Sequence, residues 1–446
     1  MRIEKFFLGK FYPVIIAALC FLSHISSLEW LFGGAVVLLA TLSLVWSHSL
    51  LPVLAPVLFI CFHISRVDSA AQATSSDSYF SGVGILVLSV FLAVFLSALA
   101  VRLIKKLRDK PVRPCELPFF GSALLLISAL FIGGFGSGKY TPKNLLLALF
   151  VSATLFLFFY LFYIALRGEE KEKILEYLCR LSAISAFLIG LEVAWLYIEG
   201  GVISGGEIVK EKILFGWGIW NTAGSVISVL IPNCFLGLVL YGKRVYLVAA
   251  SLAYLAAIFT LSRGALILSS IVYIVGIIVA LARGKYKKQM QKILLCVAPV
   301  ALTLVILFSG RIFTLFSDFF ERGFSDNGRF ALWRQGLSAF LSAPLFGNGF
   351  FGVPAPDDFA SSLPGMLHST PVQLLCATGI FGFLAYVNYR VQTLRLVFKN
   401  PSFEKTMLAL SILTILLGSL LDNFVFYMHT MLYPSAVLAA ICRLSE

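Results

Sequence analysis

Fourteen apolar segments follow one another along the chain, and most are long enough to cross a bilayer, which takes about 20 residues of α-helix. Charged residues make up only 13% of the sequence, about half of the roughly 25% that soluble domains carry. So few charges exclude a set of soluble domains. The sequence therefore predicts an all-α fold, a polytopic transmembrane bundle of about 12–14 spans.

Short polar connections separate the apolar segments. The third is short and contains Pro52 and Pro56, so a broken or re-entrant helix is expected there. One connection is long, and it predicts a large, partly helical extracytoplasmic loop over residues 311–369. The expected spans are 11–25, 28–46, 50–65, 80–101, 117–135, 145–166, 174–198, 218–240, 245–261, 264–282, 293–310, 370–389, 406–421 and 424–441.

The net charge of +13 is distributed unevenly between the two sides of the membrane. If the N-terminus is inside, 24 of the 35 Lys and Arg residues fall in cytoplasmic segments. This bias predicts a multi-pass protein of the cytoplasmic (inner) membrane with both termini cytoplasmic. It also accounts for the basic surplus without nucleic acid, and leaves membrane lipids as partners. The basic residues expected outside are Arg66, Lys139, Lys143, Lys210, Lys212, Arg263, Arg311, Arg322, Arg329 and Arg334.

The long loop contains a segment with the periodicity of an amphipathic helix. Arg329 and Arg334 flank its apolar stripe, an arrangement typical of a helix at the membrane interface. Asp326 or Asn327 is expected to cap its start and Pro344 to mark its end. The same pattern also fits arginines that only reach lipid headgroups. The stripe consists of Phe330, Trp333, Leu337, Phe340 and Leu341.

The loop ends beside a histidine. Thr370 is expected to cap the next span, with Pro371 at its first position and Gln373 completing a capping box. His368 then lies at the outer interface, where a group that titrates near neutral pH suits a general base. An interfacial histidine that only bonds a headgroup or a carbonyl is the alternative. Asp422, Asn423 and His429 form a second group that could line a polar cavity.

Arg263 joins two apolar runs with almost no linker. An arginine near membrane depth is costly unless it has a partner, and no acidic residue is near it in the sequence. A phosphate is a suitable ligand, because a guanidinium can grip it with two parallel hydrogen bonds. A topological anchor at a tight turn is the alternative.

Three stretches together resemble the O-antigen ligase / O-antigen polymerase superfamily of integral membrane glycosyltransferases. They are GWGIWNTAGSVISVLIP, ending at Pro232, LSRGA at 261–265, and the segment 328–382. The last has the order Arg329, Trp333, PLFGNGF, His368 and a GIFG sequence. The resemblance covers about residues 215–390, which divides the chain into an N-terminal transmembrane region (1–214), a catalytic region (215–390) and C-terminal helices (391–446). His368 is followed by Ser369, where many members have asparagine.

The resemblance implies an activity and a set of roles. Such enzymes transfer a glycan from an undecaprenyl-pyrophosphate carrier to a sugar hydroxyl, on either a lipid A core or a growing glycan, so ligase and polymerase remain open. It implies that His368 activates the hydroxyl. It also implies that Arg263, Arg329 and Arg334 hold the pyrophosphate, with Asn221 as a further substrate-binding residue. No cofactor or metal is expected, because the pyrophosphate is already a good leaving group.

A lipid-linked oligosaccharide flippase or another polytopic transporter is the main rival. Its central spans would carry cationic residues, and it would need no large outer loop. Here the spans are nearly free of charge, with Arg180 and Glu192 as the main exceptions. This pattern favours the transferase.

Overall fold

A computed structural model describes residues 2–26, 28–63, 82–204, 207–209, 212–215, 218–283, 287–288, 291, 328–353 and 365–446. The chain divides into two compact units. The first comprises Met1–Leu103 and Gly168–Phe324, and the second comprises Ile104–Arg167 and Ser325–Glu446.

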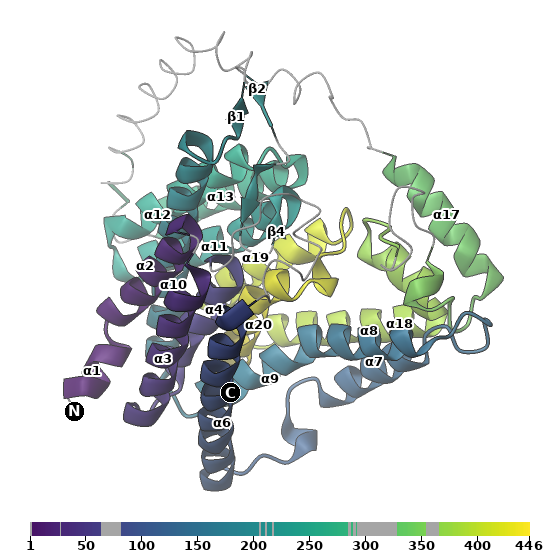
Figure 1. The fold of residues 1–446 in the computed structure, drawn as a ribbon, viewed down its shortest axis with the longest axis horizontal. Helices are drawn as coiled ribbons and strands as arrows, with labels where there is room; N and C mark the ends of the chain where they lie inside the picture. The colour runs from purple at the N-terminus through teal and green to yellow at the C-terminus, as the bar shows by residue number, and fades with distance from the viewer. Residues whose placement is uncertain are drawn as a thin grey trace. The chain divides into compact units, whose positions relative to one another are not determined.

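The first unit is a bundle of helices (Figure 1). The third expected span begins with a 3₁₀ turn, Leu51–Val53, that runs directly into α4, so the structure shows no break at its prolines. Two short hairpins, Ile203–Ser204 with Glu207–Ile208 and Leu214–Phe215 with Gly218–Ile219, lie between α10 and α11. The helices are α1 (Arg2–Leu8), α2 (Phe11–Ser26), α3 (Glu29–Trp46), α4 (Leu54–His63), the first part of α6 (Gly82–Asp109), α10 (Lys171–Ile198), α11 (Trp220–Tyr241), α12 (Arg244–Phe259) and α13 (Arg263–Arg283).

Small side chains let α11 pack closely against its neighbours. Of its most apolar stretch, 94% is buried, against 28% for α13. Gly237 leaves room for the ring of Tyr246 on α12, and Gly276 of α13 lies against the ring of Phe235. Lipid tails are as apolar as leucine, so helices in a membrane associate through such close contacts rather than through the hydrophobic effect. The buried face of α12 accordingly includes Ala249, Ala250, Ala253, Ala256 and Ala257.

The second unit is also helical. Helix α7 packs against α18, and α20 packs against α9 and α19. Helices α8 and α9 are joined by a π-helical stretch, Ala153–Leu157, into one 25-residue apolar rod. The helices are the end of α6, α7 (Phe120–Ile132), α8 (Pro142–Ser152), α9 (Phe158–Leu166), α17 (Arg329–Ser342), α18 (Thr370–Phe398), α19 (Phe403–Gly418) and α20 (Met428–Ser445).

Helix α18 is broken at Gly379, whose φ of 66° and ψ of −166° are not helical. The chain that follows α17 fills the break. Asn348 and Gly349 donate their backbone N–H groups to the carbonyls of Cys376 and Ala377, at 2.8 and 2.9 Å. In return, the N–H groups of Ile380 and Phe381 donate to the carbonyls of residues 344 and 345. This exchange satisfies backbone groups that a helix break inside a bilayer would otherwise leave bare.

Residues 345–349 form a tight turn that contains two glycines with positive φ. Gly347 and Gly349 have φ values of 70° and 75°, which only glycine adopts without strain. A β-carbon on Gly347 would lie 2.5 Å from the carbonyl carbon of Ala377. The motif therefore serves close backbone contact at the break in α18.

The helices confirm an all-α polytopic membrane bundle. Every expected span has a described helix at its place except 293–310, which lies outside the described residues. The described helices that are long and apolar enough to cross a membrane are Pro142–Leu166, Lys171–Ile198, Asn221–Tyr241, Arg263–Arg283 and Thr370–Phe398.

Candidate active site

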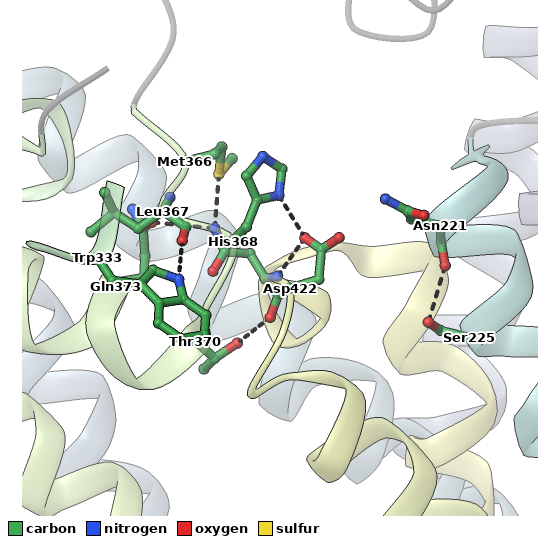
Figure 2. A network of polar contacts seen from close by, with 10 residues as sticks. Asn221, Ser225, Trp333, Met366, Leu367, His368, Thr370, Gln373 and Asp422 are labelled. Carbon is green, nitrogen blue, oxygen red and sulfur yellow. Dashed lines mark hydrogen bonds and ion pairs between the residues drawn. The ribbon is translucent and has the colours of Figure 1, made fainter. Parts of the chain in front are cut away.

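His368 is paired with Asp422, a residue that lies beyond α19 in the chain. Nδ1 of His368 is 3.2 Å from Oδ1 of Asp422 (Figure 2). The histidine side chain is 38% exposed, whereas the aspartate side chain is 7% exposed. An ionised carboxylate only accepts hydrogen bonds, so Nδ1 is the donor in this contact, and in a neutral imidazole the lone pair is then on Nε2. A reachable imidazole oriented by a buried carboxylate has the arrangement of a general base.

The backbone at His368 is left-handed, with a φ of 46°. A residue with a β-carbon pays roughly 1–2 kcal/mol for this conformation, so neighbouring contacts must hold it there. Helix α18 begins directly after this turn, and the N–H of Thr370 donates to the carbonyl of Ser419, at the end of α19, at 2.9 Å. The ends of α18 and α19 are thereby joined, which brings Asp422 to the histidine.

The expected capping box at the start of α18 is wrong. Ser369, and not Thr370, is the N-cap residue, and its side chain makes no capping bond. The hydroxyl of Thr370 instead donates to the carbonyl of Asp422 at 3.3 Å. The expected cap located the start of α18 to within one residue. The side chains of Thr370 and Gln373, however, form hydrogen bonds to the loops around the site and do not cap the helix.

Gln373 and Asn423 form the polar layer behind the pair. Oε1 of Gln373 accepts from the N–H of Leu367 at 2.9 Å and from Nδ2 of Asn423 at 3.2 Å. Nε2 of Gln373 donates to the carbonyl of Gly365 at 2.9 Å. Both amides are buried, and the backbone N–H of Asn423 also donates to Oδ1 of Asp422 at 2.7 Å. The carboxylate and the histidine loop are thus held by one hydrogen-bond network.

Helix α17 lies against this loop and carries Arg329 and Arg334. Its N-cap is Gly328, with a φ of 76°, so the expected cap by Asp326 or Asn327 is wrong. Its end at Ser342, just before Pro344, is as predicted. Arg329 is half-buried and Arg334 is exposed, because a step of five residues turns them to different faces of the helix. Three members of the apolar stripe are exposed: Phe330, Leu337 and Leu341.

Asn221 and Arg263 lie in the first unit, where α11 packs on the turn between α12 and α13. Gly224 makes this approach possible, since a β-carbon there would overlap that of Ala265. The hydroxyl of Ser262 accepts from the N–H of Ala265 at 3.4 Å, at the start of α13. Two stretches that were separate in the sequence, around Asn221 and around Arg263, therefore meet.

The sequence did not reveal the pairing of Asp422 with His368. Asp422 and Asn423 were noted only as neighbours of His429, although the polar pair at the end of an apolar span was a usable signal. Residues 311–327 and 354–364, with Arg311, Arg322 and the acidic pair Asp357 and Asp358, lie outside the described residues.

The fold and this site define a class, that of polytopic membrane proteins with a polar side-chain network at the ends of their helices. Residues 247–387 match the family model described as O-Antigen ligase. This match covers part of the chain only; it supports membership of the O-antigen ligase / O-antigen polymerase superfamily and, in general terms, a membrane glycosyltransferase of the O-antigen ligase type. A search of curated proteins finds no match to the chain.

Proposed function

We propose that the protein transfers a glycan from an undecaprenyl-pyrophosphate carrier to a sugar hydroxyl, on the outer face of the cytoplasmic membrane. The observation that carries the proposal is the contact between His368 and Asp422. In the reaction, Nε2 of His368 takes the proton of the acceptor hydroxyl. The hydroxyl oxygen bonds to the anomeric carbon as the bond from that carbon to the phosphate oxygen breaks. The electron pair of the broken bond leaves with the pyrophosphate.

Positive charge supplies the other half of the chemistry. Arg263, Arg329 and Arg334, together with the amide of Asn221, bind the pyrophosphate in this proposal. Fixed cations aimed at a leaving group stabilise charge as it develops, which is commonly a large contribution to catalysis. A guanidinium suits a phosphate better than an ammonium group does, because it offers two parallel donors.

The acceptor separates two versions of the same chemistry. A lipid A core as acceptor would make the protein a ligase, and a growing repeat chain would make it a polymerase. Both require a hydroxyl near His368 and a donor pyrophosphate at the arginines. The two versions therefore share the proposed residues and differ in the surface that receives the acceptor.

Transfer is measured with the purified protein in lipid nanodiscs, a synthetic polyprenyl-pyrophosphate glycan and each acceptor in turn. Product formation and release of polyprenyl pyrophosphate are followed together. His368→Ala is expected to lower kcat by roughly 10²–10⁴-fold. Arg263→Gln and Arg329→Gln are expected to raise the KM for the donor. Arg263→Lys is expected to raise it less than Arg263→Gln does, because lysine keeps the charge but not the two parallel donors.

The measurement also tests the rival flippase. A flippase would move the intact lipid-linked glycan across a vesicle membrane without breaking the bond to phosphate. Full transfer by His368→Ala would remove the base assignment. Movement of intact donor with no transfer by the wild-type protein would favour the flippase.

A further inference from the structure

Leu367, the residue before His368, has both of its backbone groups held by side chains from two different helices. Its N–H donates to Oε1 of Gln373 on α18, at 2.9 Å. Its carbonyl accepts from Nε1 of Trp333 on α17, at 2.9 Å (Figure 2). The N–H and the carbonyl of Leu367 belong to the two peptide planes on either side of its Cα, so these two bonds restrain both planes and orient the strained turn at His368.

The contact between α17 and Leu367 includes a second point on the same face. Gly336 is three residues after Trp333, a spacing that places both on one side of the helix. A β-carbon at Gly336 would lie 2.5 Å from Cδ1 of Leu367 and 3.0 Å from Cγ1 of Val372. The indole of Trp333 thus donates its hydrogen bond from a helix, α17, that packs closely against Leu367 and the start of α18.

The other end of α17 is tied to the break in α18. Nδ2 of Asn348 donates to the carbonyl of Ala339 at 2.6 Å, while the backbone N–H of Asn348 donates to the carbonyl of Cys376. Helix α17 is therefore anchored to the loop before α18 near one end and to the break in α18 at the other, and it also carries Arg329 one turn before Trp333.

We propose that Trp333 is a positioning residue, whose indole N–H holds Leu367 so that His368 keeps its left-handed turn beside Asp422. Because Arg329 is on the same helix as Trp333, a donor pyrophosphate bound to Arg329 is held at a fixed distance from the imidazole of His368. The inference rests on the proposed function. It assigns Trp333 an effect on the chemical step and not on donor affinity.

The test is Trp333→Phe, which keeps an aromatic ring in the contact and removes the N–H. Trp30→Phe is the matched control, since Trp30 is 45% exposed on α3. In nanodiscs, Trp333→Phe is expected to lower kcat roughly tenfold to 10²-fold, as misplacement of a reacting group can. The KM for the donor is expected to stay within about threefold, as is the affinity for a non-transferable polyprenyl pyrophosphate analogue.

A double-mutant cycle with His368→Ala shows whether Trp333 acts through the base. If it does, adding Trp333→Phe to His368→Ala lowers the remaining rate little further. The inference would be overturned if Trp333→Phe lowered kcat by the same factor with and without His368→Ala. It would also be overturned if donor affinity fell together with kcat, or if the kcat of Trp333→Phe equalled that of Trp30→Phe. If the His368→Ala rate is too low to measure, the comparison of kcat with donor affinity decides. Failure of the wild-type protein to transfer any glycan would instead refute the proposed function.

Discussion

The imidazole of His368 and the carboxylate of Asp422 are in contact, with Nδ1 3.2 Å from Oδ1, although they are separated by 54 residues. The connection is made by backbone groups. The start of α18 is joined to the end of α19 through Thr370 and Ser419, and the N–H of Asn423 holds the same carboxylate oxygen. The pair is thus a product of how two helix ends meet.

Asp422→Asn is expected to lower kcat by roughly 10²-fold or more, because the imidazolium formed during proton transfer loses its carboxylate. The amide has nearly the same volume, so the fold should be retained. Transfer kinetics in nanodiscs check this prediction, with Asp109→Asn at the exposed end of α6 as the control. A rate equal to that of the control would mean that the carboxylate serves only to shape the loop.

Alanine substitutions at three glycines distinguish the cost of backbone strain from the cost of close packing. Gly379→Ala should destabilise most, because a φ of 66° costs about 1–2 kcal/mol for alanine and the new methyl group meets the carbonyl of Leu345. Gly136→Ala carries the strain alone, since φ is 78° but nothing lies within 4 Å. Gly121→Ala, in open space and without positive φ, should be neutral or stabilising by about 0.5–1 kcal/mol. Unfolding midpoints in detergent should follow this order, and equal effects of Gly379→Ala and Gly136→Ala would contradict close packing at the break.

Lys405 is expected to stabilise the junction of α18 and α19. Its side chain is buried, and Nζ donates to the carbonyls of Leu396, Lys399 and Asn400 at the end of α18. Lys405→Met keeps the volume but removes three hydrogen bonds to helix-end carbonyls, at an expected loss of about 1–3 kcal/mol. Lys173→Met, which removes an exposed ion pair with Glu170, should change the unfolding midpoint little. An equal change in both variants would show that the buried bonds add nothing.

Hydropathy was sufficient to predict the helices, because the bilayer demands about 20 apolar residues per span whatever the fold. The start of α18 and the end of α17 were also predicted from local signals, to within one or two residues. The contacts that shape the site were not, because they depend on tertiary structure. Thr370 has the composition of a cap, but the carbonyl of Asp422 competes for its hydroxyl. The break at Gly379 could not be predicted because the segment that pairs with it, residues 344–349, is brought there by tertiary contacts.

Gly224→Ala tests whether the approach of α11 to the α12–α13 turn matters for Arg263. The new methyl group would overlap Cβ of Ala265 and lie 3.1 Å from Oγ1 of Thr260, so the turn must shift. The expected result is a loss of about 1–3 kcal/mol in stability and a raised KM for the donor, with a smaller change in kcat.

Adding Ala265→Gly removes the group that the methyl overlaps, so the double variant should recover most of the donor affinity. The cost should be only the roughly 0.5–1 kcal/mol that glycine imposes in a helix. Donor binding and unfolding midpoints of both variants check this, and a double variant as weak as Gly224→Ala would show that the contact does not position Arg263.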